Sequence, residues 1–131
     1  MKKLLYLVHR LPFPPNKGDK ISSNNMLNYF CARWRVHLGT FVDDPDDWKY
    51  VDVVRNKCED SCIVDLPKSK RLTGSLCGIV TGQALSLSYY GNTELQEWVR
   101  ACIARECPDA VLIFSGVMGR FVKGLLPAHV P

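Results

Sequence analysis

Two kinds of apolar pattern alternate along the chain. Continuous apolar runs occur at 4–8 (LLYLV) and within 109–116 (DAVLIFSG), and such runs are typical of strands that are covered on both faces. The segment 36–42 alternates instead, as a half-buried strand does, and 62–66 (CIVDL) is a short run closed by a proline. The pattern predicts four strands.

A helical spacing of apolar residues separates the first strand from the second. Its apolar positions recur at i, i+3, i+4 and i+7, which places them in one stripe on a helix that faces a sheet. Asp19 precedes the stripe and belongs to the residue types that cap helix amino ends, so we expect the helix to begin there. The stripe consists of Leu27, Phe30, Cys31 and Trp34.

Helix-start signals recur twice further along the chain. Asp44 is a suitable N-cap and Pro45 is tolerated in a first turn, so a helix is predicted that runs to about Cys58. Thr93 and Gln96 have the spacing of a capping box, and the helix that they open ends before a proline. Its stripe is Leu95, Trp98, Val99, Cys102 and Ile103. The segment 67–83 has no clear form, and 117–126 has the composition to begin one more helix.

The alternation of strands and helices predicts the architecture. Helical crossovers between strands imply an α/β fold of the Rossmann-like type, an open parallel sheet with helices on both faces and right-handed connections. We expect the strand order 3-2-1-4, in which the connection reverses direction between the first and fourth strands. Ligands of such sheets bind at that switch point, so the loop 9–19 and the turn at Ser115 and Gly116 are expected to line one cleft.

Length, charge and the amino terminus limit the remaining choices. With 131 residues, of which 47% are hydrophobic, the chain has the size of one domain, 1–131. The net charge of +4 comes from scattered lysines and arginines, which favours anionic partners only mildly, and we expect no nucleic-acid partner. The apolar start MKKLLYLVHRLP is too short for a signal peptide, and no run is long enough to cross a bilayer. These features predict a cytoplasmic protein.

The six cysteines are predicted to be reduced thiols. The chain is not a short loop-rich scaffold, and several cysteines fall on predicted apolar faces. Neither Cys58 with Cys62 nor Cys102 with Cys107 has the two-residue spacing of a zinc knuckle, and no histidine lies close to them in the sequence. We therefore expect no metal site and no cofactor.

The loop HRLPFPPNKGD, residues 9–19, is the strongest candidate for a binding element. Its prolines fix an extended path, and Gly18 allows a ligand to approach the backbone at the amino end of the helix. The loop lacks both the dinucleotide-binding and the phosphate-loop glycine patterns. Arg10, Lys17 and Lys20 are suited to neutralise phosphates, although solvated loop charges on an ordinary surface turn explain the same residues.

Four segments carry a resemblance to a known family. LYLVHRLPFPPNKGDKISS, VHLGTFVDDPDDW, TGQALSLSYY and PDAVLIFSG resemble the amino-terminal half of bacterial family 4 glycosyltransferases, which have the two-domain GT-B fold. The resemblance is greatest to the subgroup associated with exosortase and PEP-CTERM exopolysaccharide systems. It covers nearly the whole chain.

The resemblance implies an activity and a division of labour. Such enzymes move a sugar from a nucleotide-sugar donor to a saccharide or lipid-linked acceptor with retention of configuration, in exopolysaccharide or cell-surface glycan synthesis. This half recognises the acceptor and a carboxyl-terminal domain grips most of the donor, so the chain is expected to be a fragment that is inactive alone.

The resemblance also implies roles for individual residues. Gly18 matches the glycine that approaches the donor phosphates, and Ser115 and Gly116 match the turn beside the reaction centre. Ser22 stands where the subgroup has an arginine, and no histidine follows the fourth strand. The catalytic residues therefore stay unknown.

The sequence is also compatible with two other functions and with a membrane contact. The fold also suits a stand-alone flavodoxin-like module that binds a small molecule, or a non-catalytic interaction domain. Basic residues followed by apolar ones are able to rest on the inner face of the cytoplasmic membrane, although a helix packed on the sheet has the same pattern. That segment contains Lys68, Lys70, Arg71, Leu72, Leu76, Ile79 and Val80.

Overall fold

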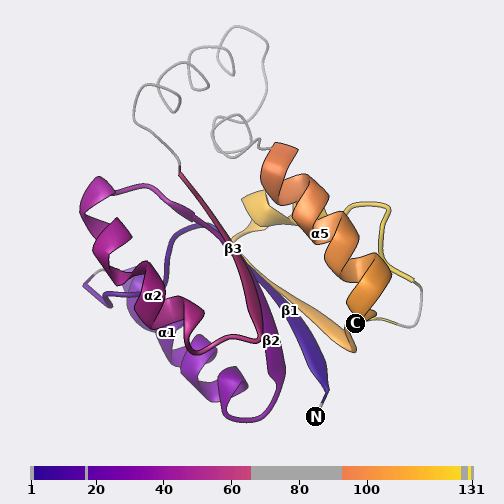
Figure 1. Ribbon diagram of the computed structural model, residues 1–131, viewed down its shortest axis with the longest axis horizontal. Helices are drawn as coiled ribbons and strands as arrows, with labels where there is room; N and C mark the ends of the chain where they lie inside the picture. Colours follow the sequence, from indigo (N-terminus) through magenta and orange to yellow (C-terminus); the bar gives the residue numbers. More distant parts are fainter. Residues whose placement is uncertain (1, 17, 66–92, 128–129, 131) are drawn as a thin grey trace, which may run out of the picture.

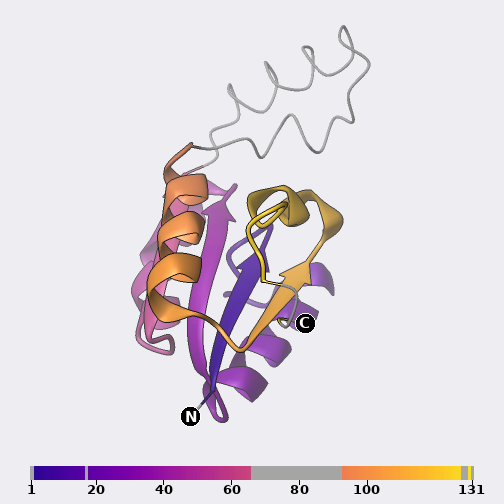
Figure 2. The same cartoon turned by 90° about the vertical axis from the view of Figure 1, so that its right-hand side faces the viewer.

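The protein is a three-layer α/β structure. The computed structural model describes residues 2–16, 18–65, 93–127 and 130. One parallel sheet forms the middle layer, α1 (Gly18–Cys31) lies on one face, and α5 (Thr93–Glu106) lies on the other (Figures 1 and 2). The α/β class and the placement of helices on both faces are confirmed.

Four strands make up the sheet. They are β1 (Lys3–Val8), β2 (Arg35–Val42), β3 (Asp60–Asp65) and β4 (Ala110–Phe114), and all their pairings are parallel. Their order is β3-β2-β1-β4, which confirms the predicted order and the reversal between β1 and β4. β3 begins two residues earlier than the sequence pattern indicated, because Asp60 already pairs with His37 of β2.

Successive residues of the central strand β1 pack alternately against the two helical layers. Leu5 and Leu7 pack into the core cluster that includes α5, whereas Leu4, Tyr6 and Val8 pack into the cluster on the α1 side. All five side chains are buried. The continuous apolar run LLYLV is thus explained, since a strand covered on both faces has no solvent-facing position.

The segment after β2 is less regular than predicted. Asp44 caps it as expected, and its carboxylate accepts a hydrogen bond from the Asp46 N–H at 3.0 Å. The chain then forms a 3₁₀-helix, η1 (Pro45–Tyr50), and a short α-helix, α2 (Val51–Arg55), both on the α1 side of the sheet. The prediction of a single helix that reaches about Cys58 is therefore wrong, because the first part is a 3₁₀-helix and the α-helix ends at Arg55.

Two smaller expectations about helix starts are also corrected. α1 begins at Gly18, so Asp19 lies inside the first turn, where its carboxylate forms ion pairs. Gln96 of α5 donates its side-chain N–H to the Phe121 carbonyl at 2.9 Å, which ties α5 to the segment after β4. That segment was expected to begin a helix, and it forms the short 3₁₀-helix η2 (Gly116–Phe121), which packs on the α5 side of the sheet. The segment 67–83 lies outside the described residues.

Candidate functional site

The carboxyl ends of β1 and β4 meet at the switch point of the sheet. Val8 is paired with Phe114 at the last position of the two strands, so the loop that starts at His9 and the turn at Ser115 leave the sheet side by side. The His9 ring stacks on the Phe114 ring, with centroids 6.0 Å apart and planes 6° from parallel. The predicted juxtaposition of the two segments is confirmed.

A network of polar and charged side chains surrounds the beginning of α1. His9 Nε2 lies 3.0 Å from Asp19 Oδ2. Arg10 Nε lies 3.7 Å from the same Asp19 oxygen and 3.3 Å from Asp43 Oδ2. Because Asp43 directly follows β2, the network joins the loop after β1, the end of β2 and the first turn of α1.

Among the described residues of this network, Arg10 is the cation placed to meet an anion. Its contacts with the two aspartates run through Nε, and its side chain keeps 28% of its surface exposed. A guanidinium has two further amino groups, so one arginine is able to be oriented by carboxylates and still bind a phosphate. Asp19 and Asp43 therefore orient Arg10 at the edge of the sheet.

Lys20 has a structural position that the sequence did not reveal. Its Nζ lies 2.6 Å from Asp47 Oδ2, and the two side chains are only 3% and 6% exposed. The ammonium is engaged inside the protein, where it joins α1 to η1. The geometry gives the predicted phosphate-binding role of Lys20 no support, and Lys17 lies outside the described residues.

Gly18 stands at the first position of α1 with open space beside it. A Cβ placed on Gly18 would have no atom within 4 Å, and the same holds for Gly116. Neither glycine is therefore required by packing within the described part of the protein. Open space at a helix amino end, next to Arg10, is what an anionic ligand needs to reach the backbone N–H groups.

Ser115 has a strained backbone. Its φ of 87° and ψ of 128° lie in a region that favours glycine, and its side chain makes no capping hydrogen bond to η2. Strained residues of this kind are concentrated at functional sites. Ser115, which the family resemblance singled out, is thus also a conformational outlier.

The roles of the aspartates around this site were missed by sequence reasoning. Asp43 and Asp47 belong to the run VDDPDDW, in which Asp47 was interpreted only as part of a helix start and Asp43 was given no role. For Asp43 the available signal was its position immediately after β2, because the carboxyl ends of parallel strands converge on the ligand edge of the sheet. Asp47 lies within η1 and had no such signal. The partners Arg10 and Lys20 were not recognisable from spacing.

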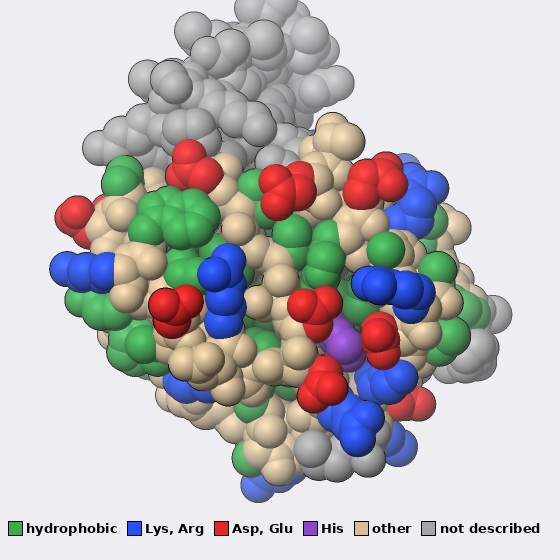
Figure 3. Space-filling view, in the orientation of Figure 1, with side chains coloured by type: hydrophobic (Ala, Val, Ile, Leu, Met, Phe, Trp, Pro, Cys, Tyr) green, Lys and Arg blue, Asp and Glu red, His purple; other side chains and the backbone are tan. Residues whose placement is uncertain are grey.

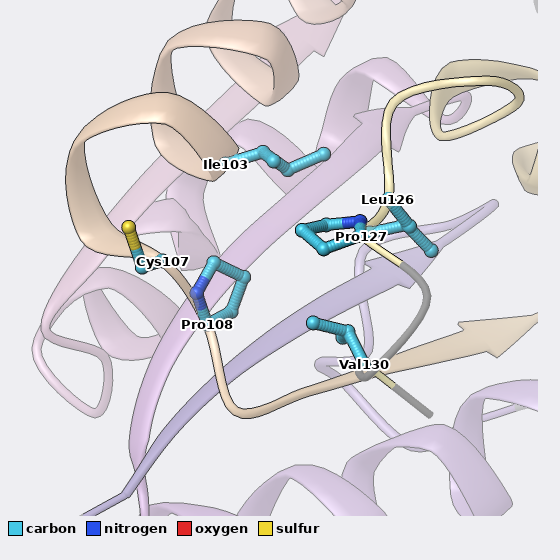
Figure 4. Close-up of a pocket in the computed structure, with 6 residues that line it drawn as sticks. All are labelled: Ile103, Cys107, Pro108, Leu126, Pro127 and Val130. Carbon is cyan, nitrogen blue, oxygen red and sulfur yellow. The ribbon is translucent and has the colours of Figure 1, made fainter.

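A pocket elsewhere does not belong to this site. It has a volume of about 160 Å³ and is lined by Ile103, Cys107, Pro108, Leu126, Pro127 and Val130. Figure 4 shows that it lies between the end of α5 and the segment near the carboxyl terminus. Pro108 precedes β4, so the pocket is at the amino end of that strand, away from the switch point. Its apolar lining offers little to orient a charged ligand.

The surface charges do not form a single patch on the face that Figure 3 shows. Lys and Arg side chains are interspersed there with Asp and Glu. Such mixing does not favour a polyanion such as nucleic acid on that face. Within the described ranges, no group of three His, Cys, Asp or Glu side chains is arranged to hold a metal ion.

Comparisons with known proteins add no relative. Searches against protein-family models, curated proteins and solved structures gave no match. Among the helices that the structure describes, none has the length and apolarity to cross a membrane. The basic and apolar segment 68–80, which the sequence linked to a membrane surface, lies outside the described residues.

Proposed function

We propose that this chain is the acceptor-side domain of a retaining glycosyltransferase of the GT-B type. In this proposal the edge of the sheet formed by the loop 9–16, the first turn of α1 and the turn at Ser115 faces the reaction centre. The donor is a nucleotide sugar and the acceptor is a saccharide or a lipid-linked saccharide. The reaction takes place in the cytoplasm, at the inner face of the membrane when the acceptor is lipid-linked.

The observation that carries the proposal is the open amino end of α1 next to Arg10. Gly18 is exposed at the first position of α1 and a Cβ there would meet no atom within 4 Å, and the positive end of the helix dipole lies at this position. Arg10 adds a guanidinium that Asp19 and Asp43 hold in place while they offset its charge, so it contributes oriented N–H donors rather than a net positive charge. A diphosphate is the ligand that uses both features.

In this proposal Arg10 and the amino end of α1 stabilise negative charge on the donor diphosphate and form no covalent bond with the substrate. In sugar transfer the bond between the sugar and the donor diphosphate breaks, and negative charge accumulates on the leaving diphosphate. N–H groups and a guanidinium that are already in position favour that charge without reorganisation. We propose that Arg10 and the amino end of α1 perform this role and that the turn at Ser115 and Gly116 borders the sugar.

The strand order weighs against one alternative. In flavodoxin-like sheets the first strand lies between the second and the third, whereas here β1 lies between β2 and β4. The order β3-β2-β1-β4 is that of a Rossmann-like half. An interaction domain remains compatible with the fold, and it predicts no response of the switch point to nucleotides.

The test is NMR titration of the chain with nucleotide diphosphates, nucleotide sugars and inorganic pyrophosphate. Because the resemblance places most donor contacts in a second domain, we expect dissociation constants on the order of 1 mM, which NMR detects. Amide resonances of Gly18, Asp19, Ser115 and Gly116 should shift together. A titration to well above that concentration in which these resonances do not move would contradict the proposal.

Matched arginine variants separate specific binding from general charge attraction. Arg10→Gln should weaken the interaction about tenfold, the effect of losing one charge-assisted contact. Arg100→Gln removes the same charge from the exposed surface of α5 and should leave the titration unchanged. Equal losses in both variants would indicate non-specific attraction.

A further inference from the structure

Two cysteines lie together at the end of the molecule remote from the switch point. Cys31 is the last residue of α1, and Cys58 lies in the turn that follows α2. Both thiols are free, half-buried and packed against the same core cluster on the α1 side of the sheet. The two cysteines were not paired by the sequence analysis, because they belong to different helical segments.

A hydrogen bond between neighbouring residues holds the two turns in contact. Lys57 Nζ donates to Asn28 Oδ1 at 2.9 Å. Asn28 is three residues before Cys31 on the same side of α1, and Lys57 directly precedes Cys58. The Lys57 ammonium also lies 5.5 Å from the centre of the Phe13 ring, which further fixes its position.

Both neighbours of Cys58 in the sequence bond to residues that flank Cys31, since the Glu59 N–H also donates to the Val36 carbonyl at 2.9 Å. This places the two thiols near one another. The Cys58 thiol lowers the pKa of Cys31, and the Lys57 ammonium lowers it further against the opposing effect of burial. The Cys31 thiol and burial raise the pKa of Cys58. Cys31 is therefore the thiol of the two that ionises more readily.

We propose that Cys31 and Cys58 form a redox-active dithiol, a modification site at which hydroperoxides produce an intramolecular disulfide. In the first step the Cys31 thiolate attacks one oxygen of hydrogen peroxide, the O–O bond breaks, and the departing hydroxide takes up a proton to become water. Cys31 is then a sulfenic acid. The thiol sulfur is oxidised by two electrons and the peroxide is reduced by two.

Cys58 completes the reaction. Its sulfur attacks the Cys31 sulfur, an S–S bond forms, and the S–O bond breaks. The hydroxide that leaves takes the Cys58 proton and departs as a second molecule of water. The pair thus consumes one peroxide, loses two hydrogens and becomes a disulfide.

The other described cysteines do not share this environment. Burial raises the pKa of Cys62 and of Cys102 to about 11, so both stay protonated at neutral pH. Cys107 is exposed at the end of α5, where its Sγ lies 3.9 Å from the Ala104 carbonyl oxygen. We therefore expect Cys31 to react about tenfold faster than Cys107 with hydrogen peroxide.

The dithiol does not depend on the proposed glycosyltransferase function. α1 has 14 residues and so is about 20 Å long, and its two ends carry the two sites. Gly18 and Arg10 lie at the amino end and Cys31 at the carboxyl end. Failure of either proposal leaves the other intact.

The test is mass spectrometry of the chain after treatment with hydrogen peroxide. Trypsin releases Cys31 in the peptide 21–33 and Cys58 in the peptide 58–68, and fragmentation distinguishes Cys58 from Cys62 within the second peptide. We expect a cross-linked pair of these peptides, joined through Cys31 and Cys58, that disappears on reduction. Oxidation of the folded chain without this cross-link, or at Cys107 before Cys31, would overturn the proposal.

Two serine variants test the order of the steps. Cys58→Ser keeps a hydrogen-bond donor beside Cys31 but cannot form the disulfide, so a sulfenic acid should accumulate on Cys31 and react with dimedone. Cys31→Ser should leave Cys58 unlabelled, and Cys107→Ser, the control, should form the disulfide as the unaltered chain does. Dimedone labelling of Cys58 in Cys31→Ser would contradict the assigned roles, and circular dichroism verifies that each variant is folded.

Discussion

The Lys20 ammonium lies 2.6 Å from the Asp47 carboxylate, and both side chains are almost completely withdrawn from solvent. This ion pair links the first turn of α1 to the 3₁₀-helix η1, which follows β2 in the sequence. A buried charge that loses its partner keeps its desolvation cost without the compensating attraction. We therefore expect Lys20→Met to lower the free energy of unfolding by roughly 3 to 5 kcal/mol in urea denaturation.

The double variant distinguishes the ion pair from simple packing. Lys20→Met together with Asp47→Leu removes both charges, so it should be markedly more stable than Lys20→Met alone. The exposed ion pair of Arg55 and Asp52, with side chains 50% and 89% exposed, provides the control. Arg55→Met should change stability by less than about 0.5 kcal/mol. Additive losses in the double variant would argue against the buried ion pair.

Gly39 of β2 is closely covered by side chains of β1 and α5. A Cβ at this position would lie 2.7 Å from Leu7 Cδ2, 3.0 Å from Leu95 Cδ1 and 3.1 Å from Trp98 Cζ3. These three side chains would have to shift to admit a Cβ, so Gly39→Ala should destabilise the protein by about 1 to 3 kcal/mol. The measurement is thermal unfolding. Gly119→Ala, where the added Cβ has no neighbour within 4 Å, should leave the melting temperature nearly unchanged.

Tyr6 should make the protein sensitive to alkali. Its hydroxyl is buried and donates to the Ser23 carbonyl at 3.1 Å, and burial raises its pKa above the ordinary value near 10. Above that pH the unfolded chain loses the tyrosine proton while the folded chain keeps it, so the unfolded state binds fewer protons. The stability contributed by Tyr6 is therefore fully present below about pH 10 and decreases as the pH rises further.

Urea denaturation between about pH 9 and pH 11 measures this effect. Tyr6→Phe removes the titrating group, so its stability should fall less steeply over that interval than that of the unaltered chain. Below pH 9 the variant should be less stable by about 1 kcal/mol, because the hydrogen bond to Ser23 is lost. Identical slopes for the two proteins would show that the Tyr6 hydroxyl has no part in the alkaline transition.

The fold was predictable because its signals are local. The runs at 4–8 and within 109–116 and the stripe of α5 identify buried strands and a helix without knowledge of their neighbours. The handedness of crossovers and the usual doubly wound order then gave β3-β2-β1-β4. Strand order in turn placed the loop after β1 beside Ser115, so the location of the candidate site followed from topology.

The chemistry of the site was less predictable because it depends on distant partners. The buried face of α1 consists of Lys20, Ser23, Asn24 and Leu27. These residues continue the helical spacing of the predicted apolar stripe towards the amino end of the helix, but three of the four are polar. A search for apolar residues alone does not detect this face. Even with the face identified, nothing local indicates that Asp47 neutralises Lys20 or that Asp43 contacts Arg10.

Replacing Ser115 by glycine should increase the stability of the protein and weaken its binding of nucleotide. Its φ of 87° costs on the order of 1 kcal/mol or more for a residue with a Cβ, and glycine adopts this conformation freely. Ser115→Gly should therefore raise the free energy of unfolding by about 1 kcal/mol, after allowance for the greater freedom of glycine in the unfolded chain. Ser115→Ala keeps the strain, so its stability should match that of the unaltered chain.

The same substitution should weaken the proposed ligand interaction. Strain at this position persists because the surrounding structure holds the turn in one conformation, and a glycine would let the turn sample others. We expect Ser115→Gly to reduce the nucleotide-induced shifts of the Gly18 and Gly116 amides in the NMR titration although the protein is more stable. If Ser115→Gly proves less stable than the unaltered chain, Ser115 stores no strain, and the case for the turn as a functional element loses its physical basis.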